Sequence, residues 1–231
     1  MRAKKISKRF GPNVALQDAS FSVRGNEVLG LIGPNGSGKT TLFECLVGLI
    51  PTDAGVVEFQ GKLLAPSRRK QALFYLPDGI RPWADQSVAW MLGFFESLYH
   101  RSKGEGAELA ERFQLEKLMK SRVGTLSKGE LKRAMLALGL LAPHRLLLLD
   151  EPFDGLDFRQ TRDVMDVLRS YPSKGRTLFL SIHQRSDASR VCDRLVLLSE
   201  GRVVGEGTLP ELRTRAGLAE GGLEEIFLAL T

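Results

Sequence analysis

The stretch GPNGSGKTT, from Gly33 to Thr41, constrains this chain of 231 residues more than any other feature. Gly33, Gly38, Lys39 and Thr40 satisfy the spacing G-x-x-x-x-G-K-[ST] of a phosphate-binding loop. Glycines let such a loop curl so that successive N–H groups point inward, and the following helix adds the positive end of its dipole. The run VLGLI before the loop reads as a buried strand, and TTLFECLVGL after it reads as a helix. The pattern predicts binding of a nucleoside triphosphate.

The residues of the loop have separate expected roles. Lys39 is expected to reach the β- and γ-phosphates, and the Thr40 hydroxyl is expected to bind Mg²⁺. The residues expected to contact the triphosphate are Gly33, Pro34, Asn35, Gly36, Ser37, Gly38, Lys39, Thr40 and Thr41. The alternative is a glycine-rich turn without a ligand, but at average amino-acid usage chance gives this pattern on the order of one time in a hundred for a chain of this length.

Bulk composition is ordinary for a globular protein, with 43% hydrophobic and 26% charged residues. The longest uncharged apolar run, AMLALGLLAP, is about half of a membrane span. Basic residues rather than a signal peptide follow Met1, and Cys45 and Cys192 have no metal-binding spacing. The net charge of +6 suits nucleic acid or an anionic membrane, but such basic runs are more often solvated faces. We expect a cytoplasmic protein without direct membrane insertion and without a nucleic-acid partner.

Strand and helix patterns alternate along the chain and predict a single α/β domain over residues 1–231. The expected strands are 14–23, 28–32, 146–149 and 177–183, with a turn into 56–62, a short apolar run at 72–77 and a hairpin at 194–207. The expected helices follow the loop and cover 159–171, 209–217 and 223–231, with a helical insertion at about 83–141. The predicted fold is a P-loop NTPase core with a mostly parallel sheet, an N-terminal antiparallel β subdomain and an inserted α-helical subdomain; antiparallel pieces should lie at the edges of the sheet.

Two carboxylates follow the apolar run LLLL. Asp150 can deliver one carboxylate to the Mg²⁺ shell at the carboxyl edge of the sheet. Glu151 is then placed to orient or deprotonate an attacking water, and a positioned base of this kind contributes roughly 10²–10⁴-fold to a rate. The alternative is a pair of carboxylates that are only solvated at a strand end.

The stretch LSKGE, from Leu126 to Glu130, has the residue types of a helix capping box. Ser127 can accept from the N–H three residues later, while Glu130 reaches back to the N–H of Ser127. Apolar residues at 131, 134, 135 and 138 then give the helix a buried face. Capping and packing by themselves account for every residue choice in this stretch.

The order of these motifs is more specific than any one of them. RFG at 9–11, the phosphate loop, LPD at 76–78, LSKGE, LLLLDEP, DGLD at 154–157 and SIH at 181–183 follow one another along the chain. This succession resembles the ATP-binding-cassette (ABC) ATPase family over essentially the whole chain. The ending LEEIFLALT looks like the tail of nucleotide-binding subunits that serve exporter-type permeases.

The resemblance implies a role for each matching residue. Phe10 matches the aromatic residue that stacks on adenine, Glu151 the catalytic carboxylate, and His183 the residue that contacts the γ-phosphate. Thr40 and Asp150 match the Mg²⁺ shell. Without the resemblance, a phenylalanine such as Phe10 is more often a core residue. A histidine at a strand end, such as His183, is usually a surface residue whose hydrogen bonds are already made.

The resemblance also implies a second copy of the chain. The signature residues Ser127, Lys128, Gly129 and Glu130 match the loop that contacts ATP bound to the other copy, and Asp157 matches the loop that links the two sites. Two chains are therefore expected to sandwich two ATP molecules. A helix start with a free hydroxyl and N–H groups suits the γ-phosphate on physical grounds as well.

Three positions depart from the family pattern. Asp78 stands where the family usually carries glutamine; it either binds Mg²⁺ or adds negative charge near the γ-phosphate, unless the true counterpart lies within DGIRPW. Lys128 replaces a common glycine and Glu130 a common glutamine. A lysine near phosphate is favourable, and glutamate preserves the capping box.

The leading hypothesis is an ATPase subunit on the inner face of the membrane that drives a separately encoded permease. The permease is expected to be an exporter and to dock around Trp83–Tyr99. The alternatives are a soluble ABC ATPase that acts on nucleic acid or ribosomes, and a nucleotide-gated binding module of low turnover. The sequence leaves open the transported substrate, import against export, and homodimer against heterodimer.

Overall fold

A mostly parallel sheet of six strands forms the centre of the protein. The computed structural model describes residues 1–231 except the side chain of Arg185. The strand order is β10-β9-β3-β8-β7-β6, with β10 antiparallel to β9 and all other neighbours parallel. The strands are β3 (Val28–Ile32), β6 (Leu73–Leu76), β7 (Leu146–Leu149), β8 (Thr177–Ile182), β9 (Arg194–Ser199) and β10 (Arg202–Gly207). The predicted parallel sheet with an antiparallel hairpin at its edge is confirmed.

A second sheet contains the N-terminal strands. It is antiparallel, in the order β2-β1-β4-β5, and consists of β1 (Arg2–Phe10), β2 (Asn13–Ser22), β4 (Ala54–Phe59) and β5 (Lys62–Leu63). The expectation that these strands would lie at an edge of the parallel sheet is wrong, because β1 pairs with β2 on one side and β4 on the other. Strand β1 itself was not predicted. Its sequence RAKKISKRF buries few apolar side chains, and register shifts interrupt its alternation.

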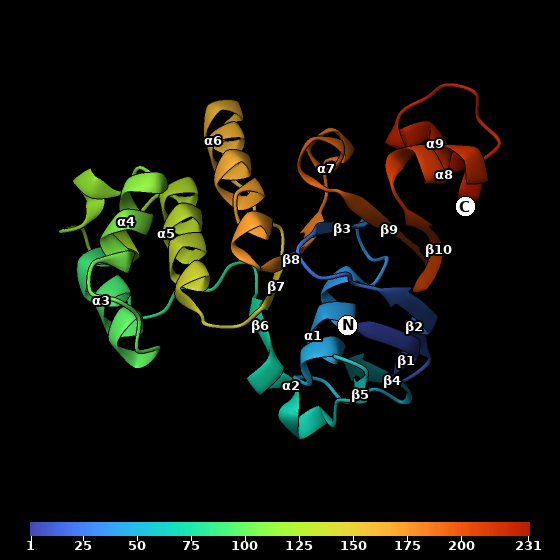
Figure 1. The fold of residues 1–231 in the computed structure, drawn as a ribbon, viewed down its shortest axis with the longest axis horizontal. Coiled ribbons are helices and arrows are strands. Elements are labelled where there is room, and N and C mark those ends of the chain that lie inside the picture. The colour runs from blue at the N-terminus through green and yellow to red at the C-terminus, as the bar shows by residue number, and fades with distance from the viewer.

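Helices occupy both faces of the parallel sheet and the connection between β6 and β7. They are α1 (Lys39–Val47), α2 (Pro66–Ala72), α3 (Val88–Leu98), α4 (Glu105–Arg112), α5 (Lys128–Leu141), α6 (Phe158–Arg169), α7 (Arg185–Val191), α8 (Leu209–Arg215) and α9 (Leu223–Leu230), with short 3-10 turns η1 (Glu116–Leu118), η2 (Val123–Thr125) and η3 (Pro172–Lys174). The helices α3, α4 and α5 lie together at one end, and the antiparallel strands lie at the other (Figure 1). The seven-residue helices α2 and α7 were not predicted.

Side chains that alternate along the parallel strands build two separate cores. Leu146 and Leu148 pack with Phe179 on the face that α1 and the antiparallel sheet cover. Leu147 and Leu149 belong to the cluster on the opposite face, which includes residues of α5, α6, α7 and α9. Because successive side chains of a strand point to opposite faces, the run LLLL fills both cores at once.

The register of the parallel strands brings their carboxyl ends together. Ile32 of β3 pairs with Ile182 of β8, and Leu149 of β7 pairs with Leu180 of β8 and Leu76 of β6. The phosphate loop, the two carboxylates and the histidine motif therefore all leave the sheet at one edge, which we call the carboxyl edge. Ligands of open α/β sheets bind outside this edge. Within the part of the chain that the structure describes, no helix has the length and apolar character needed to cross a bilayer.

Candidate nucleotide site

The phosphate loop runs from β3 into α1 with two glycines in crowded positions. Gly38 precedes α1 with φ 102°, and a Cβ there would lie 2.6 Å from the carbonyl oxygen of Ala15. A Cβ on Gly33 would lie 2.3 Å from the carbonyl oxygen of Leu198. Glycine is required at 38 for the left-handed backbone and at both positions for close approach to neighbouring strands. The loop is therefore clamped between the parallel and antiparallel sheets.

Two side chains of this loop are buried and polar. The Lys39 ammonium group donates to the carbonyl oxygens of Gly33 at 2.8 Å and Pro34 at 3.2 Å. Burial lowers the pKa of Lys39, and the two carboxylates that follow β7 oppose this effect. The Ser37 hydroxyl is buried and has no hydrogen-bond partner among the described residues. The loop thus offers a cation and a hydroxyl to an anionic oxygen ligand, beside the start of a helix.

Three hydroxyl groups converge on the carboxylate of Asp150. Thr40 Oγ1 donates to Asp150 Oδ2 at 3.0 Å, and the Tyr75 hydroxyl donates to the same oxygen at 3.1 Å. The Ser181 hydroxyl donates to the other oxygen. Burial, with the nearby Asp150 charge as a smaller cause, raises the pKa of Tyr75, which keeps its hydroxyl a donor. Asp150 is only 5% exposed, so these bonds fix its orientation.

The donor set around Asp150 fits Mg²⁺. A hydroxyl from the helix after the loop and a carboxylate from β7 lie within hydrogen-bond distance, and both are hard oxygen ligands. The described residues contain no group of three or more His, Cys, Asp or Glu side chains that could hold a metal by themselves. This matches a Mg²⁺ site that takes one or two protein ligands and completes its shell with phosphate oxygens and water.

Tyr75 and Ser181 had no predicted role. Ser181 was noted only as the first residue of the SIH motif, and Tyr75 was not singled out. Tyr75 lies in the strand β6, where a tyrosine reads as one more apolar residue. Ser181 is completely buried in β8 among Leu and Ile residues. A polar residue inside a buried strand needs a hydrogen-bond partner. A serine or tyrosine within an apolar strand sequence could therefore have marked these two positions.

Glu151 has a main chain that is held from two sides. Its φ is 45°, a left-handed conformation that is uncommon for a residue other than glycine. Its N–H donates to Ser181 Oγ at 2.9 Å, and its carbonyl oxygen accepts from Lys132 Nζ at 2.8 Å. Glu151 lines a cavity of about 300 Å³ together with Asn35 of the phosphate loop and His183. Strained backbone held by surrounding bonds is common at active sites.

Phe10 and His183 are both exposed. Phe10 ends β1 with 47% of its surface exposed, and Lys8 Nζ lies 5.3 Å from the centre of its ring. The core alternative for Phe10 is therefore excluded. His183 directly follows β8 at the carboxyl edge. Both side chains are accessible to a ligand from solvent, as base stacking and phosphate contact require.

The first turn of α5 is the predicted capping box. Glu130 N–H donates to Ser127 Oγ at 3.3 Å, and Ser127 N–H donates to Glu130 Oε2 at 2.8 Å. The bond from the Ser127 N–H lowers the pKa of Glu130. Ser127 itself is exposed. The box fixes the start of α5 and leaves a serine hydroxyl at the surface beside the free N–H groups of the helix.

The remaining signature residues contact the DGLD turn. Lys128 Nζ lies 2.7 Å from Asp154 Oδ2, and a Cβ on Gly129 would lie 3.0 Å from the carbonyl oxygen of Gly155. Asp157 caps α6 by accepting from the Gln160 N–H at 2.8 Å. The starts of α5 and α6 therefore lie against each other through backbone contact that only a glycine at 129 permits.

Asp78 forms an ion pair that the sequence did not suggest. Its carboxylate forms an ion pair of 2.5 Å with Lys132 Nζ, although both residues line a cavity of about 300 Å³ with Asp150. Lys132 was not singled out from the sequence. It lies next to the buried face of α5 that begins at 131, and a buried lysine beside an acidic strand end was the signal that could have identified it.

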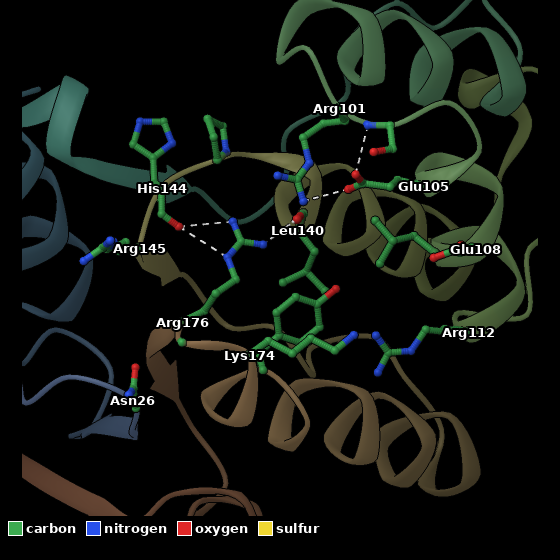
Figure 2. A pocket seen from close by; sticks show the side chains of 15 residues that line it. Asn26, Arg101, Glu105, Glu108, Arg112, Leu140, His144, Arg145, Lys174 and Arg176 are labelled. Carbon is green, nitrogen blue, oxygen red and sulfur yellow. Dashed lines mark hydrogen bonds and ion pairs between the residues drawn. The ribbon is translucent and has the colours of Figure 1, made fainter.

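A larger cleft lies away from these residues, between α4, the C-terminal end of α5 and η3. It has a volume of about 880 Å³ and a strongly basic lining (Figure 2). Arg101 pairs with Glu105 at 2.7 Å, and Arg176 donates to the carbonyl oxygens of Leu140 at 2.7 Å and His144 at 3.1 Å (Figure 2). The Arg101 pair lies within the helical insertion, and Arg176 joins the C-terminal end of α5 to the start of β8, so both cations already have protein partners. None of the predicted site residues lines this cleft.

Comparison with known proteins identifies the family. The family model described as "ABC transporter" matches residues 16–154. The doxorubicin resistance ATP-binding protein DrrA of Mycobacterium tuberculosis is 36% identical over 220 residues, which are 92% of this chain and 66% of that protein. The lipopolysaccharide export system ATP-binding protein LptB of Escherichia coli K12 is 30% identical over 227 residues, which are 92% of each chain. A solved ATP-binding subunit of an ABC transporter has a TM-score of 0.89 at 29% identity and covers 99% of this chain and 98% of its own.

The family model covers the phosphate loop, LPD, LSKGE and LLLLDEP, and it ends at Asp154, the first residue of the DGLD turn. It agrees with the geometry of the carboxyl edge, where a phosphate loop, a hydroxyl and two carboxylates converge. The chain belongs to the ABC transporter family, as an ATP-binding subunit that hydrolyses ATP to power transport.

Proposed function

We propose that two copies of this chain close around two ATP molecules, each held between the phosphate loop of one copy and the first turn of α5 of the other. The contact between Thr40 and Asp150 supports the nucleotide half of this proposal, because it brings together two oxygen ligands suited to Mg²⁺ from residues 110 positions apart. The exposed Ser127 at the start of the 14-residue helix α5 supports the second half. Its hydroxyl and the helix N–H groups would stabilise the γ-phosphate as an arginine finger does in other phosphoryl-transfer enzymes.

The residues at the carboxyl edge divide the chemistry of hydrolysis among them. Residues 33–41 would hold the triphosphate, Phe10 would stack on the adenine, and Thr40 with Asp150 would hold Mg²⁺. When bound, Mg²⁺ neutralises charge on the phosphate oxygens. Glu151 would orient and deprotonate the attacking water, and His183 would contact the γ-phosphate. The Asp157 turn would lie between the two sites of the dimer.

The dimer can be tested with a variant that binds ATP but does not split it. Light scattering of full-length Glu151→Gln with ATP and Mg²⁺ should give twice the mass of the nucleotide-free chain, and ADP should give the monomer mass. The double variant Glu151→Gln with Ser127→Glu should stay monomeric, because a carboxylate would then face the γ-phosphate. A strictly monomeric chain with ATP and Mg²⁺, even beside its membrane component, would contradict the proposal.

We further propose that the chain drives export through a separately encoded permease. The names of the similar proteins DrrA and LptB refer to drug resistance and to lipopolysaccharide export. Trp83, Trp90 and Phe94 around the start of α3 are each more than 40% exposed and contact one another, with Trp90 stacked on Phe94 at 5.2 Å. An exposed aromatic patch of this kind is typical of a protein interface. It supports docking of the permease on the helical insertion.

Co-purification tests the permease, and vesicle transport tests the direction. The chain should be retained on membranes of its native host together with an integral membrane protein, and Trp90→Glu should release it while leaving the fold intact. In inside-out vesicles, an exporter accumulates its substrate when ATP is added outside. Recovery of the chain without any integral partner would favour the soluble alternative. The basic N-terminal residues do not favour nucleic acid, because Lys4 pairs with Glu58 and Lys8 with Asp53.

A further inference from the structure

Lys132 is a buried cation with two partners from different parts of the site. It lies on α5, and its side chain is 9% exposed. Its ammonium group binds the carboxylate of Asp78, which follows β6, and the carbonyl oxygen of Glu151, which follows β7. A buried ammonium group is costly unless it is paired and hydrogen-bonded, so these two contacts determine where the side chain lies. One residue of the helix thus joins two strand ends of the carboxyl edge.

The contact with Glu151 restrains the main chain of the proposed catalytic carboxylate. Glu151 has φ 45°, and its own N–H is already bound by Ser181. The carbonyl oxygen at the other end accepts from Lys132 Nζ at 2.8 Å and from the Asp154 N–H at 3.2 Å, and the charged donor makes the stronger of these two hydrogen bonds. Because a left-handed conformation persists only where the surroundings hold it, loss of the Lys132 bond should loosen this restraint and let the carboxylate move.

The contact with Asp78 neutralises a third carboxylate near the proposed nucleotide site. Asp150 and Glu151 already place negative charge at the carboxyl edge, and Asp78 lines the same cavity as Asp150. Burial is the main cause that raises the pKa of the Tyr75 phenol, and the charge of Asp78 adds a small contribution behind that of Asp150. A free Asp78 would repel the γ-phosphate or attract the divalent cation. The ion pair with Lys132 suppresses both effects.

We propose that Lys132 is a positioning residue for ATP hydrolysis, which holds the main chain of Glu151 in its reactive orientation and keeps the Asp78 carboxylate away from the divalent cation. This inference rests on the proposed role of Glu151. It also accounts for an aspartate at position 78: the aspartate is tolerated because the lysine on the neighbouring helix carries the opposite charge.

The test uses the full-length chain with Lys132→Met, Asp78→Asn and the double variant. Loss of the bond to Glu151 should lower kcat by between about tenfold and a hundredfold with KM for ATP nearly unchanged, since a misplaced group affects the transition state. Release of Asp78 should tighten binding of Mn²⁺ in the presence of ADP by about fivefold, measured by electron paramagnetic resonance. The double variant should restore wild-type affinity for Mn²⁺ but keep the low kcat.

A neighbouring residue provides the matched control. Arg133 on the same helix donates to the carbonyl oxygens of Phe113 and Gln114 within the helical insertion, so Arg133→Met removes a similar cation without touching the carboxyl edge. It should keep kcat within about twofold of the wild type, because it only loosens packing. Thermal unfolding of each variant without nucleotide reports whether it is folded, and Lys132→Gln replaces Lys132→Met if the latter fails to fold.

The outcomes separate this inference from the proposed function. A folded Lys132→Met variant with wild-type kcat and unchanged affinity for Mn²⁺, in a chain that Glu151→Gln inactivates, overturns the role of Lys132 alone. An equal loss of kcat in Arg133→Met overturns it as well, because the effect would then come from general damage to α5. Hydrolysis that survives Glu151→Gln overturns the role of Glu151 and this inference with it.

Discussion

The carboxyl edge of the parallel sheet and the first turn of α5 are both expected to contact ATP, but they are built in opposite ways. At the carboxyl edge the polar groups bind one another across long sequence distances, as Thr40, Tyr75 and Ser181 do around Asp150. In the first turn of α5 the cap is local, because Ser127 and Glu130 bind each other, and only the exposed Lys128 reaches a distant residue, Asp154. The edge is buried and held by tertiary contacts, whereas the helix start is exposed and held by its own cap.

This difference indicates which half of the site is complete in one chain. The hydroxyl groups of Thr40, Tyr75 and Ser181 all have Asp150 as a partner within one chain, so this part of the carboxyl edge is ordered before nucleotide arrives. The Ser37 hydroxyl of the phosphate loop, which has no partner among the described residues, is left for the ligand. The exposed serine at the helix start has a local partner and needs no further contact to be stable. Nucleotide binding should therefore depend on the edge of one chain, and dimer formation on the helix start of the other.

The largest expected effect lies at the carboxyl edge. Glu151→Gln should lower kcat by roughly 10²–10⁴-fold, or about 3–5 kcal/mol, because it removes the base but keeps the shape of the side chain. Affinity for ATP should change little, since the phosphate loop is intact. Phosphate release under single turnover and nucleotide binding by fluorescence measure the two quantities.

A second glutamate in the same backbone conformation serves as the control for this variant. Glu200 has φ 47° in the turn between β9 and β10 and is exposed. Glu200→Gln should keep full activity. Unchanged hydrolysis in Glu151→Gln would support the binding module of low turnover that the sequence left open.

The next effect concerns the close contact between the starts of α5 and α6. Gly129→Ala places a Cβ 3.0 Å from the carbonyl oxygen of Gly155 and 2.9 Å from the side chain of Gln160, so the starts of α5 and α6 must separate. Overpacking of this kind costs typically about 1–3 kcal/mol of unfolding free energy. Gly93→Ala in α3 is the matched control, because a Cβ there meets no atom within 4 Å, and it should stabilise the helix slightly. Urea unfolding of both variants compares them, and equal stability would contradict the close contact.

A smaller effect on the single chain is expected from Ser127→Ala. Loss of an N-cap costs about 1 kcal/mol. Thr208 caps α8 with the same box through Glu211, so Thr208→Ala should cost a similar amount. Only Ser127→Ala should also weaken the ATP-dependent dimer, by about tenfold if the serine contributes one hydrogen bond to a charged phosphate. Equal dimerisation of the two variants would remove the serine from the interface.

The same contrast explains what the sequence could predict. The phosphate loop and the capping box of Ser127 could be predicted because their geometry depends on residues that are close in the chain. The parallel sheet could be predicted because a buried strand such as LLLL is recognised from its own apolar residues. Tyr75 and Lys132 were not, because each acquires its role only from a strand end far away in the sequence. Strand β1 was missed because its partners, β2 and β4, supply the burial that its own residues do not show.

The smallest expected effect is a pH dependence confined to the first turn of α5. The Ser127 N–H lowers the pKa of Glu130 below the value of 4.5 that it has when the chain is unfolded. A carboxyl whose pKa is lowered by folding stabilises the folded state above its unfolded pKa, and this stability is lost as the pH falls through the folded pKa. A charge at a helix N-terminus is worth about 0.3–1 kcal/mol. The wild type should therefore exceed Glu130→Gln in unfolding free energy by this amount near neutral pH, and the difference should vanish below the folded pKa. Glu211→Gln in the matching box of α8 should show the same sign, and a difference that stays constant down to low pH would show that the cap acts through shape rather than charge.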